Sequence, residues 1–184
     1  MTKHPALIKT AVLLFALIFA MGLNGRTQNS QPTEYQIKAA FIYNFARFVD
    51  WPTQAFADAS SPMTIGVLGK NVFGDDLQQA ISGKDIKGHS LQFKQFDSVS
   101  DVTNCQVLFI SDSEKSHYSR ILSRLQGTCV LTVSENTDDF IGTGGMINLV
   151  IMDNKVRFEI NNDAAKKAGL TISSKLLSLA INSP

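Results

Sequence analysis

The hydrophobic pattern after residue 32 begins with a long apolar helix. Thr33 to Gln36 matches a capping box, which predicts a helix start, and the Trp51-Pro52 pair predicts its end. At 100° per residue the helix carries one continuous aromatic and aliphatic face, formed by Ile37, Phe41, Phe45 and Phe48. We expect a core helix wedged between a sheet and later elements; the alternative is a partner or dimer surface.

The rest of the chain alternates between strand-like and helix-like segments. Short apolar or alternating runs predict about six strands, over 63–68, 90–96, 106–111, 129–133, 146–152 and 156–160. Helices are expected over 72–81, 113–125, 163–168 and 172–180. A strand-helix-strand unit implies parallel strands with a right-handed crossover. The pattern therefore predicts one α/β domain, with a mixed, mostly parallel sheet and helices on both faces.

The N-terminal segment differs from this pattern. Lys3 and Lys9 stand beside an uncharged apolar run over 10–23, which is shorter than the roughly 20 residues that span a bilayer. We predict an exported protein whose residues 1–25 form a cleaved signal peptide; an uncleaved anchor is the alternative. A polar linker over 26–32 and an α/β domain over 33–184 follow. The mature chain should begin between Leu23 and Thr27.

The near-zero net charge of the chain argues against a nucleic-acid partner. The 184 residues include 17 Lys and Arg against 16 Asp and Glu, and loss of Lys3 and Lys9 with the leader brings the mature chain close to −1. With this nearly neutral charge, the sequence also has no cluster of basic residues of the kind that binds a phosphate backbone. We therefore expect no nucleic-acid partner.

Two cysteines remain in the exported chain, Cys105 and Cys129. Export permits a disulfide, and each cysteine stands at the start of one of two strands joined by a single helix, so we predict a Cys105–Cys129 bond. The alternative is two separate core thiols. No Cys and His cluster has zinc-site spacing, so no metal is expected.

The motifs of nucleotide binding and catalysis are missing from the sequence. Gly69 and Gly74 have the spacing of a phosphate loop, but Asp75 and Asp76 follow where Lys and Ser or Thr are needed. His89 at a turn and His117 on a charged helix face favour solvent-exposed positions, and no nucleophile elbow or metalloprotease motif occurs. We therefore expect no cofactor and no enzyme activity; an undetected hydrolase is the alternative.

One polar stretch is compatible with a small-molecule site. Ser111 to Glu114 follows a buried strand, at the edge where α/β proteins place ligands. The same residues also fit a helix N-cap, which we favour. A ligand-binding module using this cleft remains the alternative function.

The order of the segments resembles the YfiR family of bacterial periplasmic regulators. The resemblance rests on 34–45 with Phe48 and Trp51-Pro52, and on 65–69, 105–111, 144–147, 156–161, 164–170 and 172–177. It implies an α/β domain in the periplasm that represses an inner-membrane diguanylate cyclase by binding its periplasmic sensor domain, which controls biofilm formation. It also implies release by a peptidoglycan-associated OmpA-like lipoprotein. Relatives that act on sensor histidine kinases are the alternative.

Partner binding requires apolar surface, and two regions supply it. One is the first helix, and the other is a glycine-rich lip over residues 140–146 that we expect to be exposed. The predicted contact residues are Phe41, Phe45, Phe48, Trp51, Phe140, Ile141 and Met146.

Overall fold

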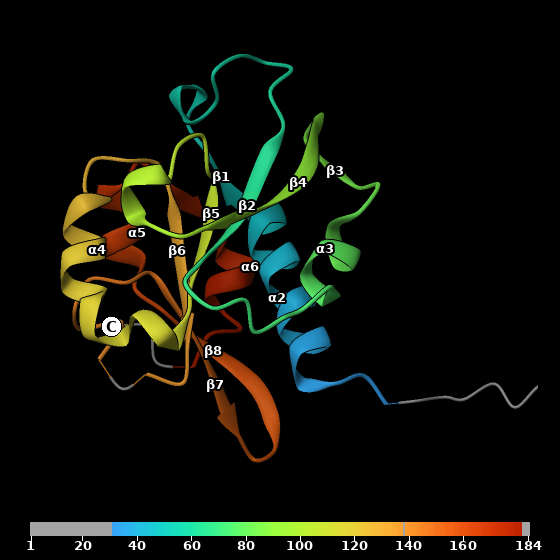
Figure 1. Cartoon of the computed structure of the whole chain (residues 1–184), viewed down its shortest axis with the longest axis vertical. Helices are drawn as coiled ribbons and strands as arrows, with labels where there is room; N and C mark the ends of the chain where they lie inside the picture. The colour runs from blue at the N-terminus through green and yellow to red at the C-terminus, as the bar shows by residue number, and fades with distance from the viewer. Residues whose placement is uncertain (1–30, 138, 182–184) are drawn as a thin grey trace, which may run out of the picture. The chain divides into compact units, whose positions relative to one another are not determined.

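The computed structural model describes residues 31–137 and 139–181, so the predicted signal peptide and most of the linker lie outside the described residues. From Pro32 onward the chain forms one compact unit of strands and helices. Figure 1 shows helices on both sides of a twisted sheet. The predicted α/β fold with a mixed sheet is confirmed.

The main sheet has seven strands in the order β3-β4-β2-β5-β6-β7-β8. The inner pairs from β4 to β7 are parallel, and the edge pairs β3-β4 and β7-β8 are antiparallel. Two further short strands, β1 and β9, pair with each other. The bounds are β1 Val49–Asp50, β2 Met63–Leu68, β3 Asp85–Ile86, β4 His89–Phe96, β5 Val107–Ile110, β6 Leu131–Glu135, β7 Ile147–Met152, β8 Lys155–Ile160 and β9 Thr171–Ile172.

The parallel strands follow a doubly wound order. Numbered along the chain, β2, β4, β5, β6 and β7 lie in the order 2-1-3-4-5, which is that of flavodoxin-like sheets. The strand order reverses between β2 and β5. In such sheets ligands bind beyond the carboxyl ends of the strands at this switch point.

Three of the later helices, α3, α4 and α6, are shorter than the sequence predicts. α2 (Glu34–Phe48) begins with the predicted capping box, in which Thr33 and Gln36 bond to each other's backbone N–H groups. The helix expected from residue 72 starts only at Asp76, because Gly74 adopts a left-handed φ of 54°. The remaining helical bounds are α3 Asp76–Ile81, α4 Tyr118–Arg124, α5 Asn162–Lys167 and α6 Ser174–Leu177, with 3₁₀ turns η1 Thr53–Ala55, η2 Val99–Asp101 and η3 Asp112–His117.

Two apolar clusters cover the two faces of the sheet. Alternate residues of β5 divide between them: Val107 and Phe109 join the cluster that includes α2, α3 and α6, while Leu108 and Ile110 join the cluster under α4. This two-sided burial explains why the central strands read as continuous apolar runs.

Candidate partner-binding groove

The aromatic face of α2 belongs mainly to the core. Phe45 is fully buried, with its ring centroid 5.1 Å from that of Phe158 in β8. Phe41 and Phe48 are half-buried, Phe41 against Phe158 and Phe48 beneath the Lys175 ammonium. The interpretation of α2 as a core helix is confirmed, and Phe45 has no surface to offer a partner.

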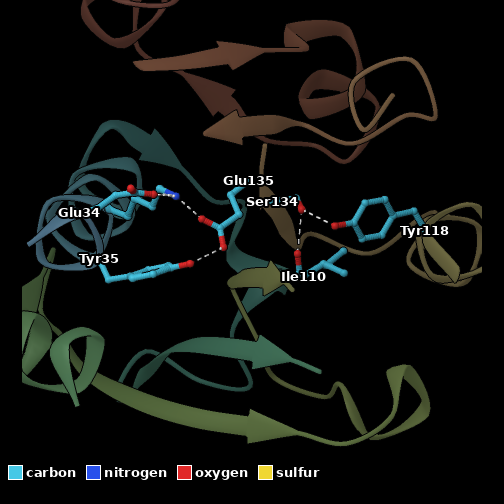
Figure 2. A network of polar contacts seen from close by, with 7 residues as sticks. Glu34, Tyr35, Ile110, Tyr118, Ser134 and Glu135 are labelled. Atoms are coloured by element: carbon cyan, nitrogen blue, oxygen red, sulfur yellow. Dashed lines mark hydrogen bonds and ion pairs between the residues drawn. The ribbon is translucent and has the colours of Figure 1, made fainter. Parts of the chain in front are cut away.

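A buried ion pair fixes α2 to the sheet. The Lys38 side chain has no exposed surface, and its ammonium donates to Glu135 at the end of β6 and lies 2.5 Å from a carboxylate oxygen of Glu34. The Tyr35 hydroxyl donates to the other oxygen of Glu135 at 3.4 Å. Figure 2 shows Glu135 receiving these contacts from α2.

Neighbouring carboxylates stabilise the charged form of Lys38. Burial alone would lower the pKa of Lys38, but the hydrogen bonds and negative charges of Glu135 and Glu34 outweigh it, so the pKa of Lys38 lies above its ordinary value. Burial, followed by the charge of Glu135, raises the pKa of Tyr35. Lys38 therefore stays charged and Tyr35 neutral around pH 7.

The neighbouring residue of β6 makes a second polar contact on the opposite face. The Ser134 hydroxyl donates to the carbonyl of Ile110 at 2.8 Å and lies 2.7 Å from the Tyr118 hydroxyl of α4, as Figure 2 shows. Burial raises the pKa of Tyr118, so this hydroxyl is neutral. The carboxyl end of β6 thus anchors a helix on each side of the sheet.

Sequence reasoning missed the Lys38–Glu135 pair. One signal was available: Lys38 precedes Ile42 and Phe45 by four and seven residues, so it continues their buried stripe. Nothing in the local pattern identifies Glu135 as its partner, because 97 residues separate them.

The lip forms one wall of a surface groove. A cavity of about 610 Å³ lies between α4, α5 and the lip, with Ile141 and Met146 in its lining. Leu122, Leu125, Val130 and Met146 of its lining are nearly buried, whereas Ile141 remains half-exposed. The other apolar lining residues are Ala164 and Ala168. Among the described residues, Lys167 is the one charged side chain in this lining.

Hydrogen bonds hold the lip against the domain. The Asn161 side-chain amide donates to the Ile141 carbonyl at 3.2 Å, and the Met146 N–H donates to the Thr132 hydroxyl at 3.1 Å. The Gly145 N–H closes the turn on the carbonyl of Phe140. These bonds attach the groove wall to β6 and to the N-cap of α5.

The prediction that Phe140 is exposed in this lip is wrong. Phe140 is fully buried, and its ring packs edge-on against that of Tyr118, with ring centroids 5.2 Å apart. A Cβ at Gly145 would lie 2.3 Å from a Phe140 ring carbon, so only glycine permits this close approach. The glycines that suggested an open lip instead let the chain fold over an aromatic anchor.

Two loops are in contact at the switch point of the sheet. The Lys70 N–H donates to the Ser113 hydroxyl at 2.9 Å, which joins the loop after β2 to the turn after β5. A Cβ at Gly69 would lie 2.6 Å from Ser113 and 2.8 Å from Glu114. Ser111 caps η3 through the Ser113 N–H, as the favoured interpretation expects. At the edge considered for a small ligand, the Ser113 and Glu114 side chains thus lie against the loop after β2.

The predicted disulfide is not formed, and both cysteines are free thiols. Cys105 lies in the cluster under α4, whereas Cys129 packs against the cluster on the opposite face. β5 and β6 are neighbours as expected, and their register would place positions 105 and 129 opposite each other. Both cysteines precede these strands, however, and they pack into different clusters. Burial raises the pKa of the Cys105 thiol to about 12, so it stays protonated and unreactive.

We expect both thiols to react with Ellman's reagent once the protein is unfolded in guanidinium without reductant. Dithiothreitol should leave the melting temperature unchanged, because there is no bond to reduce. If no thiol reacts and dithiothreitol lowers the melting temperature, the cysteines do form the predicted disulfide.

Neither a metal cluster nor a membrane-spanning helix occurs in the part of the chain that the structure describes. Within it, no three His, Cys, Asp or Glu side chains come together as metal ligands would. No described helix has the length and hydropathy to cross a bilayer.

His89, expected to be solvent-exposed, is half-buried and stacked on Phe56.

The fold and groove define a doubly wound α/β domain with a lateral surface groove. By its sequence, the chain belongs to the DUF4154 family, described as YfiR/HmsC-like, which it matches over residues 35–181. No curated protein matches the chain. A crystal structure of a conserved domain protein from Vibrio cholerae O1 biovar El Tor is similar in fold, with 12% identity and a TM-score of 0.56. That match covers 84% of this chain and 62% of the Vibrio protein.

Proposed function

We propose that this protein is a periplasmic negative regulator of an inner-membrane diguanylate cyclase. It binds the periplasmic sensor domain of that enzyme and lowers cyclic-di-GMP synthesis. The observation that carries this proposal is membership of the YfiR/HmsC-like family over nearly the whole domain. The apolar leader over residues 1–25 supports export to the periplasm.

The groove between α4, α5 and the lip is the surface that we assign to the partner. Its lining combines nearly buried apolar side chains with a half-exposed Ile141, which is the composition of a pocket that receives an apolar anchor. Lys167 in its lining favours an acidic group beside that anchor. We further propose that an OmpA-like peptidoglycan-associated lipoprotein competes for the protein and releases the enzyme.

Ile141→Ser is expected to raise cellular cyclic-di-GMP while the protein stays folded. The side chain is half-exposed, so its loss removes groove surface at a cost of about 1 kcal/mol in stability. Cyclic-di-GMP measured in cells and the melting temperature of the purified variant together test this. The matched control is Ile151→Ser, since Ile151 is an isoleucine 40% exposed on the β7–β8 hairpin rather than in the groove.

Different outcomes would contradict the proposed contact surface and the proposed function. If Ile151→Ser raises cyclic-di-GMP and Ile141→Ser does not, the hairpin replaces the groove as the contact surface. If deletion of the whole gene leaves cyclic-di-GMP unchanged and no membrane enzyme co-purifies with the protein, the repressor function is wrong.

A further inference from the structure

A second cavity lies at the end of the sheet opposite the switch point. It has a volume of about 400 Å³ and sits where β2 and β4 begin. Its walls are the segment 51–59, Met63 at the start of β2, and the turn from Lys87 to His89. Figure 1 shows the segment before β2 extending beyond the sheet at the top of the view.

Aromatic rings form much of the wall. The rings of Phe56 and His89 are stacked with centroids 3.9 Å apart and planes 8° from parallel. His89 Nδ1 lies 2.7 Å from the Ser61 carbonyl oxygen, which can only accept, so Nδ1 donates and the ring is held in place. Trp51 also lines the cavity, and its Nε1 is buried without a hydrogen-bond partner among the described residues. The indole therefore presents carbon atoms, not its N–H, to the cavity.

The charged groups of the lining do not balance. The Lys87 ammonium is already paired with the carboxylate of Asp50. Asp58 accepts hydrogen bonds from the Ser60 N–H at 2.8 Å and hydroxyl at 2.7 Å, both on one carboxylate oxygen. These bonds hold the pKa of Asp58 below its ordinary value. Ser61 also donates to this carboxylate. Asp58 makes no ion pair with any described residue and is exposed, so it places a negative charge at the rim of the cavity.

We propose that this cavity binds a small organic cation, an ammonium group with apolar substituents. The faces of aromatic rings attract cations, Trp most strongly, and the Asp58 carboxylate supplies the opposite charge at the rim. Apolar substituents fit the remaining wall of Met63, Ala57 and Ala59. The exposed Lys87–Asp50 pair links the β3–β4 turn to the start of the 51–59 segment. This site is independent of the groove and of the regulatory function proposed above.

The single tryptophan provides a direct test, because Trp51 is the only source of indole fluorescence in the chain. The probes are choline and its neutral isostere 3,3-dimethyl-1-butanol, in which carbon replaces the nitrogen. Choline should change the fluorescence saturably, and the alcohol should bind about tenfold more weakly or not at all.

Two matched variants examine the role of charge. Asp58→Asn keeps the acceptor for Ser60 and should weaken choline binding about tenfold. Asp97→Asn removes an exposed carboxylate elsewhere and should leave choline binding unchanged. The proposal is overturned if choline gives no saturable change with the folded protein, if the neutral alcohol binds equally well, or if Asp58→Asn binds choline like the original chain.

Discussion

Lys38→Met is expected to lower the free energy of unfolding by about 3–5 kcal/mol, since it leaves a buried carboxylate without its cation. Glu135 is only 5% exposed in its side chain, so water cannot replace the lost ammonium. Urea unfolding followed by circular dichroism measures the loss. The surface pair Lys166–Asp163 offers a matched control, because its side chains are 67% and 81% exposed and Lys166→Met should cost less than about 1 kcal/mol.

A double variant distinguishes an unpaired charge from a lost contact. Lys38→Met with Glu135→Leu removes both charges and should recover most of the stability, because apolar side chains of similar size replace buried ion pairs well. A double variant no more stable than Lys38→Met alone would show that the loss does not come from the stranded carboxylate.

Phe140→Ala should also lower the free energy of unfolding, by about 3–5 kcal/mol, because it opens a cavity between α4 and the lip. The adjacent Ile141 is half-exposed, and Ile141→Ala should cost about 1 kcal/mol. Thermal or urea unfolding of the two variants, which differ by one position, measures the contrast. Equal losses would contradict the burial of Phe140.

Gly145 supplies a second test of the same contact. Gly145→Ala should be strongly destabilising alone, since its Cβ would lie 2.3 Å from the Phe140 ring. Combined with Phe140→Leu, which makes room, the same change should cost clearly less than the sum of the two single effects. Strict additivity would mean that the glycine is needed for another reason.

The positions of helices and strands follow from short stretches of sequence. A capping box, a period of 3.6 residues and a run of β-branched side chains act within one element, so the start of α2 and the six longer strands were predictable. Helix ends were predicted less well. Gly74 with φ of 54° delays α3, and a 3₁₀ turn takes the place of the first turns of the helix ending at Arg124.

The candidate surfaces were predictable only in part. Clustered glycines beside Ile141 and Met146 correctly indicated the lip, and both residues line the groove. The burial of Phe140 could not be inferred, because the same glycines permit either an open loop or a close approach to a ring. The cysteines show the same limit, since strand adjacency was foreseeable while the cluster into which each side chain packs was not.

The sequence by itself determined the α/β class and the family, because these depend on local composition and on the order of segments. Only the tertiary structure decided which charges meet. Lys38 finds Glu135 across 97 positions, and Asp58 lies near Trp51 and His89 only because β2 and β4 begin side by side. Such contacts depend on how elements pack, and side-chain spacing within one element carries no information about them.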